Sequence, residues 1–148
     1  MSTPEGLPYS VTLQVRDACL CLHAQRAARA LARRFDEAFR PLDLTSGQFS
    51  LLMSLNRPEP PTLGSVAAVL AMDRTTLTAA LKPLVRRKLV KIAVDKEDRR
   101  SRRLTLTAAG RALLAKAFPI WTEKHAALDK DLAAFSLDQL RAALLAIA

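Results

Sequence analysis

The chain has 148 residues, half of them apolar, which fits one folded domain with a sizeable core and excludes a disordered chain. No run of about 18 apolar residues occurs, and the segment Met1 to Ser10 lacks a basic region followed by an apolar one. We therefore expect no membrane span, no signal peptide and a cytoplasmic location. The formal net charge is +9, and residues 82–103 alone hold ten Lys or Arg and three acidic residues. Such a segment is either a solvated surface or a face that binds nucleic acid.

The first predicted elements are helices. Apolar residues recur with a 3.6-residue period over about residues 10–40, which indicates one long amphipathic helix that Pro41 ends. Its apolar stripe consists of Leu20, Ala24, Ala27, Leu31, Phe35 and Phe39. Thr45 and Gln48 have the spacing of a capping box that opens a second helix. The apolar face of this second helix carries Phe49, Leu52, Met53 and Leu55.

Two short helices with a tight connection follow the prolines at 58, 60 and 61. The first begins near Thr62, and Asp73 caps the second, which runs to about Lys88. The first carries the apolar residues Val66, Ala67, Val69 and Leu70. The pair is typical of a helix-turn-helix. Packing Leu77, Leu81, Leu84 and Val85 against the core turns outward Thr75, Thr78, Ala79, Lys82 and Arg86.

A basic hairpin and two more helices complete the chain. Leu89 to Val94 and Arg103 to Thr107 are predicted strands, joined by a charged turn over residues 95–102. Thr107 caps a helix that runs to about Lys130, and Ser136 with Gln139 forms a second capping box before a last helix. The fold class is therefore mainly α with a small β-hairpin wing, a winged helix-turn-helix.

The terminal helices carry more apolar surface than one small domain hides easily. A partner chain would cover this surface, and the alternative is packing within the monomer. The residues concerned are Leu128, Leu132, Phe135, Leu140, Leu144 and Ile147.

Several segments together resemble the multiple antibiotic resistance regulator (MarR) family of transcription regulators over nearly the whole chain. The segment Asp98–Thr107 followed by Gly110 resembles the family's wing and its exit, with Leu104 in place of a valine. Leu44-Thr45, Gln48-Phe49 and Leu51-Leu52 resemble the family's second helix, and residues 73–78 resemble the start of its recognition helix. Lys88 departs from the pattern, because many members have glycine there, so we expect a differently built turn into the hairpin.

The resemblance implies a single MarR-like domain over residues 1–148. Residues of about 45–107 would form the winged DNA-binding part, and about 10–40 and 108–148 the dimerisation helices. Two interlocked copies would hold their recognition helices roughly 34–36 Å apart, the spacing of successive major grooves. The expected partner is therefore a pseudo-palindromic double-stranded DNA operator, bound by a homodimer acting as a repressor.

Individual DNA contacts follow from side-chain chemistry. The exposed face of the recognition helix would enter the major groove, with threonines at base edges, Arg74 on a guanine, and Lys82 and Arg86 on phosphates. The arginines of the hairpin tip suit a narrow minor groove. The expected DNA-binding residues are Arg74, Thr75, Thr76, Thr78, Lys82, Arg86, Arg99, Arg100 and Arg102. By family position, Arg100 enters the minor groove with Asp73 as its orienting partner; Asp73 as a helix cap is a compatible alternative.

The sequence offers little for catalysis. Its four glycines are isolated, neither G-x-S-x-G nor H-E-x-x-H occurs, and we expect no enzyme, no cofactor and no metal. On one helix Cys19 and Cys21 would lie about 200° apart and could not share an ion.

Three functional hypotheses follow, two of which differ in the signal that controls DNA binding. A small aromatic or anionic ligand would bind between the winged part and the dimer helices, near His23, Arg26, Phe49, Met53 and Trp121. Cys19 and Cys21 are alternatively packed structural thiols or a thiol-based oxidant sensor, and Cys21 lies at about the position of the sensing cysteine in the family's organic hydroperoxide regulators. A cysteine-dependent enzyme is the alternative of another class.

Overall fold

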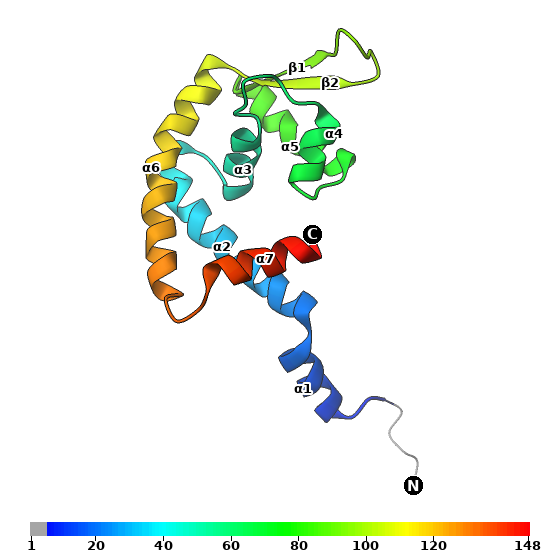
Figure 1. The fold of residues 1–148 in the computed structure, drawn as a ribbon, viewed down its shortest axis with the longest axis vertical. Helices are drawn as coiled ribbons and strands as arrows, with labels where there is room; N and C mark the ends of the chain where they lie inside the picture. The colour runs from blue at the N-terminus through cyan, green and yellow to red at the C-terminus, as the bar shows by residue number, and fades with distance from the viewer. Residues whose placement is uncertain (1–5) are drawn as a thin grey trace.

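A computed structural model describes residues 6–148, which form seven α-helices and a β-hairpin (Figure 1). In chain order the elements are α1 (Tyr9–Ala18), α2 (Leu20–Phe39), the 3-10 helix η1 (Arg40–Leu42), α3 (Ser46–Ser54), α4 (Leu63–Val69), α5 (Arg74–Arg86), β1 (Val90–Val94), β2 (Arg102–Leu106), α6 (Ala108–Asp131) and α7 (Leu137–Ile147). The mainly helical fold with a β-hairpin wing is confirmed, and the predicted strands each differ by one residue from those observed.

The core lies in the winged part of the chain, between the end of α2, helices α3 to α5, the hairpin and the first half of α6. Phe39 is fully buried and its ring stacks on that of Phe49, with centroids 4.8 Å apart. This contact joins the end of the long helix α2 to α3. The largest fully buried side chains are Phe39, Leu52, Leu77, Leu81, Leu84, Leu104 and Val66.

Side-chain caps fix where the helices begin. Thr45 and Gln48 make both bonds of a capping box, and the carboxylate of Asp73 accepts the Thr76 N–H. Thr107 caps α6 by accepting the Gly110 N–H at 3.0 Å, and Ser136 caps α7 by accepting the Gln139 N–H at 3.3 Å. The predicted caps are therefore confirmed at all four helix starts, and each satisfies a backbone N–H that the helix leaves unpaired. Of the capping box predicted at Ser136 and Gln139, the Ser136 cap is the bond that forms.

The predicted long first helix is wrong at one point, because it breaks at Cys19. That residue has φ −72° and ψ 109°, an extended conformation, and its sulfur accepts the Leu22 N–H at 3.4 Å as the cap of α2. Helix α1 has no buried residue, so no packing holds it in line with α2. As a result, both cysteines lie at the start of α2 rather than inside a continuous helix, and they need not face opposite sides of one helix.

Val85, predicted to pack against the core, is instead exposed, and so is the apolar residue Val69 of α4. Val69 is 65% exposed and Val85 is 39% exposed. Val69 faces a surface hollow that is also lined by Phe118 and Trp121 of α6, while Val85 lies at the edge of the outer face of α5.

The hairpin is a two-stranded antiparallel sheet in which Val90 pairs with Leu106 and Ile92 with Leu104. The Leu104 N–H also donates to the Pro61 carbonyl at 3.0 Å, and an isolated bridge joins Thr62 to Arg103. Pro60 and Pro61 have no N–H to donate, so the segment before α4 cannot extend this contact into a third strand.

The two terminal helices stand apart from this core. Neither α1 nor α7 has a buried residue, and α1 extends away from the rest of the chain (Figure 1). The exposed apolar side chains of the C-terminal segment are Phe135, Leu140, Leu144, Leu145 and Ile147. The alternative that the C-terminal stripe packs within the monomer is therefore contradicted for Phe135, Leu140, Leu144 and Ile147, whereas Leu128 and Leu132 are partly buried. No helix in residues 6–148 combines the length and the apolar character that a bilayer crossing needs.

Candidate nucleic-acid interface

The outer face of α5 is free of contacts with the core. Leu77, Leu81 and Leu84 are buried on one side of the helix, and Thr75, Lys82 and Arg86 are exposed on the other. A helical face with a small hydroxyl side chain near its start and cations further along fits a major groove, because base edges and phosphates are then met by different residues.

Asp73 organises the start of α5. Its Oδ1 accepts the Thr76 N–H and its Oδ2 accepts the Thr76 hydroxyl, both at 2.7 Å. These bonds, the backbone one first, lower the pKa of the Asp73 carboxyl. The hydroxyl of Thr78 donates to the Arg74 carbonyl at 2.8 Å. Two of the predicted DNA-binding threonines therefore donate their hydroxyls within α5, and Thr75 is the one whose hydroxyl has no such bond in the described chain.

Arg74 turns toward α4 rather than along α5. A Cβ atom built on Gly64 would lie 3.0 Å from Nη2 of Arg74, so the guanidinium lies against the first turn of α4. In this position the side chain reaches from α5 to α4, the two helices of the helix-turn-helix. A guanine contact by Arg74 would require it to leave Gly64.

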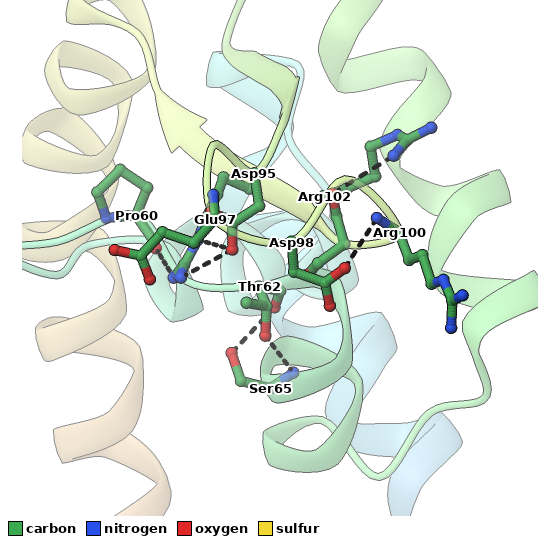
Figure 2. A network of polar contacts seen from close by, with 10 residues as sticks. Pro60, Thr62, Ser65, Asp95, Glu97, Asp98, Arg100 and Arg102 are labelled. Atoms are coloured by element: carbon green, nitrogen blue, oxygen red, sulfur yellow. Dashed lines mark hydrogen bonds and ion pairs between the residues drawn. The ribbon is translucent and has the colours of Figure 1, made fainter.

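The tip of the wing is shaped by backbone bonds. Asp98 accepts the Arg100 N–H at 3.0 Å, and Arg102 folds back so that its Nη1 donates to the Arg99 carbonyl at 3.2 Å (Figure 2). The guanidinium of Arg100 makes no side-chain bond within residues 6–148 and points away from the turn (Figure 2). Of these two arginines, Arg100 is the one free to meet DNA.

A second network, which sequence reasoning missed, holds the base of the wing. Asp95 accepts from the Glu97 N–H and from Nε of Arg103, each at 3.1 Å, and Nη1 of Arg103 donates to the Pro60 carbonyl at 2.9 Å (Figure 2). The Glu97 bond and then Arg103 lower the pKa of Asp95. The signal in the sequence is an acidic residue directly after the first strand and a basic residue on the second strand, on the two sides of the turn.

The predicted Asp73–Arg100 pair is not formed in this structure. Both oxygens of Asp73 are bonded to Thr76, and no ion pair of Arg100 occurs among the described residues. The carboxylate is instead satisfied locally, within the first turn of α5.

The exit from α5 corrects another expectation. Lys88 has φ +59°, its N–H donates to the Val85 carbonyl, and the Leu89 N–H donates to the Leu84 carbonyl, both at 2.9 Å. These two bonds form the left-handed helix end that glycine usually makes. The turn is therefore built in the usual way, with lysine in a conformation that costs an L-residue about 1–2 kcal/mol.

The comparisons with known proteins agree with this geometry. A protein family described as a winged helix DNA-binding domain matches residues 44–110. The repressor NicR of Pseudomonas putida is 33% identical over 117 residues, which are 78% of this chain and 70% of NicR. Two further curated regulators are matched over only 62% and 53% of their own length.

Solved structures extend the match over most of the chain. The regulator MosR of M. tuberculosis, solved with DNA, is 35% identical, with a TM-score of 0.76, and the match covers 87% of this chain and 92% of MosR. A mutant of MarR from E. coli, solved with operator DNA, is 25% identical, with a TM-score of 0.79 and coverage of 90% and 96%. The chain belongs to the MarR family. The relatives that it matches are transcription regulators.

The predicted ligand residues of this MarR-family chain divide between two places. Phe49, Met53 and Trp121 line a hollow of about 440 Å³ beside α6. His23 and Arg26 line another, of about 540 Å³, entirely on α2. A single chain therefore does not bring the five residues together.

A third cavity, of about 250 Å³, shares Phe49 and Trp121 with the first hollow and adds His125. The His125 ring lies 4.8 Å from that of Trp121, and its Nδ1 is 3.3 Å from Asp129. Sequence reasoning missed His125, although its position four residues after Trp121 places it on the same face of α6.

The cysteines of the MarR-family chain are both free. Cys19 caps α2 through its sulfur, and Gln25 Nε2 donates to the Cys21 sulfur at 3.4 Å. Nδ1 of His23 lies 2.7 Å from the Cys19 carbonyl oxygen, so this histidine meets the backbone of Cys19 rather than its thiol.

Proposed function

We propose that this chain is a homodimeric repressor that binds a pseudo-palindromic operator, with α5 in the major groove and the wing in the minor groove. The observation that carries this proposal is the outer face of α5, where Thr75, Lys82 and Arg86 are exposed on a helix whose other side is fixed in the core. The free guanidinium of Arg100 supports a minor-groove contact.

The uncovered terminal helices support the dimer. Exposed apolar surface on α1 and α7, outside the core, is typical of helices that pair with a second copy. In such a dimer each half of a two-fold operator would meet one winged part. We place the repressor in the cytoplasm and assign it no catalytic step.

The test is binding to the DNA upstream of the chain's own gene, measured by fluorescence anisotropy against a scrambled duplex. Because the wing and α5 bring cations to phosphates twice per dimer, affinity should fall steeply with salt, by about a thousandfold between 50 and 200 mM. Equal affinity for both duplexes, or a flat salt plot, would refute operator recognition.

We propose that release from the operator is caused by a small aromatic or anionic compound bound beside α6. The hollow of about 440 Å³ and the adjoining cavity have apolar and aromatic walls, with His125 at one end. A ligand releases DNA only by binding better to a dimer shape that fails to span both half-sites. Titrating aromatic acids into the anisotropy assay tests this, with Trp121→Ala as the variant expected to lose the response.

A thiol switch is a second candidate that one observation favours. The break at Cys19 places both thiols at the N-terminal end of α2, and Cys21 is exposed there. A Cys19→Ser, Cys21→Ser variant separates the candidates. Release of wild type by hydroperoxide that disappears in the variant supports the thiol switch, whereas ligand release in both proteins with no oxidant response supports the small-molecule repressor.

A further inference from the structure

Arg87, at the end of α5, makes two bonds to the connection between α2 and α3. Its Nη1 donates to the Asp43 carbonyl at 2.6 Å and its Nη2 approaches the Leu42 carbonyl at 3.4 Å. Asp43 has φ +50°, a left-handed conformation, directly after η1. Within residues 6–148 these are the hydrogen bonds that join α5 to this connection.

The connection itself is fixed to the end of α2. The ring stack of Phe39 and Phe49 joins α2 to α3, and Asp36 of α2 accepts the Ser46 N–H at 2.6 Å. Arg87 therefore links the C-terminal end of α5 to the long helix that leads out of the winged part. The planar guanidinium bonds its acceptors in fixed directions, so this link adds a directional constraint to the packing of α5 through Leu77, Leu81 and Leu84.

We infer that Arg87 is a positioning residue that sets the distance and angle between the two recognition helices of the dimer. The inference rests on the proposed function, namely operator binding by a homodimer. Residues of about 10–40, which include α2, are the expected N-terminal dimerisation helices, so each α5 is held relative to its partner through α2, and the Arg87 bonds lie where the two parts meet. Losing them relaxes the direction of α5 relative to α2, which leaves each half-site contact in place and weakens the preference for one half-site spacing.

The neighbouring Arg86 provides a matched control. It carries the same charge, is exposed on the outer face of α5, and makes no side-chain bond within residues 6–148. Arg86→Ala therefore removes a phosphate contact, while Arg87→Ala removes the link to α2.

The experiment uses the full chain and its own operator, mapped first by footprinting. Affinity is measured for the native operator, for variants with the half-sites moved apart or together by one and two base pairs, and for a duplex with one half-site. We expect wild type to prefer the native spacing strongly. Arg87→Ala should lose about tenfold on the native operator, keep its half-site affinity within twofold, and discriminate poorly between spacings. Arg86→Ala should weaken all duplexes similarly and keep the spacing preference.

Two further variants make the test independent of folding. Arg87→Lys keeps the positive charge but not the planar set of donors, so it should show a smaller loss of discrimination between half-site spacings. It replaces Arg87→Ala if that variant unfolds at a lower temperature than wild type. Asp43→Asn keeps the carbonyl acceptor and the left-handed backbone, so it should behave as wild type. If wild type fails to bind, the proposed function is wrong; if wild type binds and both Arg87 variants keep its spacing preference, the positioning role is wrong.

Discussion

Two residues beside the recognition helix α5 have a left-handed backbone conformation. Ala71 lies between α4 and α5 with φ +50°, and Lys88 follows α5 with φ +59°. Each completes the same pair of bonds at a helix end; at Ala71 these are the Ala71 N–H to the Ala68 carbonyl and the Met72 N–H to the Ala67 carbonyl. A Cβ atom at either position is strained, and glycine would relieve that strain.

We expect Ala71→Gly and Lys88→Gly each to raise the free energy of unfolding by about 1 kcal/mol, since the left-handed penalty of about 1–2 kcal/mol exceeds the entropy that glycine adds to the unfolded chain. Urea unfolding followed by circular dichroism measures it. Ala79→Gly, in the exposed interior of α5, is the control and should lower stability by about 1 kcal/mol. A loss at all three positions would contradict the strain.

Arg100 is the wing residue on which specific affinity should depend most. Arg100→Ala should cost about 1–3 kcal/mol of specific binding, because its guanidinium is free to enter the minor groove, while the fold stays intact. Lys96→Ala, at the same turn, is the control and should cost much less. Equal losses for the two variants would show that the wing contributes charge alone.

The proposed orienting role of Asp73 is tested by changing its charge without its cap. Asn is as good an N-cap as Asp, so Asp73→Asn should leave α5 in place while removing the attraction to Arg100. The pair is not formed in this structure, so it would have to form on the operator, and a double-mutant cycle on operator affinity with Arg100→Ala should then show coupling between the two positions. Additive losses would leave Asp73 as a cap only.

Among the elements, those with local signals were predictable from the sequence. Thr45, Asp73 and Thr107 cap helices through bonds to residues three positions away, so residue type and spacing suffice to place them. The break at Cys19 was not predictable in this way, because a thiol is an uncommon cap and the 3.6-residue pattern continues across it.

The site was predictable only where exposure follows from helix periodicity. The outward face of α5 was predictable for this reason. The bonds of Arg103 to Pro60 and of Arg87 to Asp43 were not, because they join residues that are 43 and 44 positions apart in the sequence. Such contacts depend on how the elements pack, and no local pattern encodes them. The same is true of Arg74, whose side chain lies on Gly64 of another helix.

Two carboxylates make the start of α5 and the base of the wing sensitive to acid. Hydrogen bonds lower the pKa of Asp73 and of Asp95 below their ordinary values, so their contribution to stability is present above the unfolded pKa of about 3.9 and is lost as the pH falls through the lower folded pKa. We expect thermal unfolding of an Asp73→Asn, Asp95→Asn variant to change less than that of wild type between pH 5 and 2.5. An equal change of unfolding temperature with pH in the two proteins would contradict the lowered pKa values of Asp73 and Asp95.

At the scale of the whole molecule, the core and the apolar surface lie in different places. The buried residues lie between Phe39 and Ala117, and α7 contributes none of them. The winged part should therefore fold without help from α7, and the exposed stripe of α7 should matter for assembly. On the helix, Leu137, Leu140, Leu144 and Ile147 share one side, with Ala142 opposite.

Placing a charge in this stripe should consequently separate assembly from folding. Leu144 is 50% exposed in the single chain, so Leu144→Asp should leave the winged part folded. In the proposed dimer it removes about 1.5–3 kcal/mol of apolar burial per chain, twice by symmetry, and adds an unpaired carboxylate. The dimer dissociation constant should therefore rise more than tenfold, measured by sedimentation at several concentrations. Ala142→Asp is the control and should stay dimeric. Operator affinity should also fall in the Leu144→Asp variant, because a monomer brings only one winged part to one half-site. A Leu144→Asp protein that remains a dimer would place the interface elsewhere.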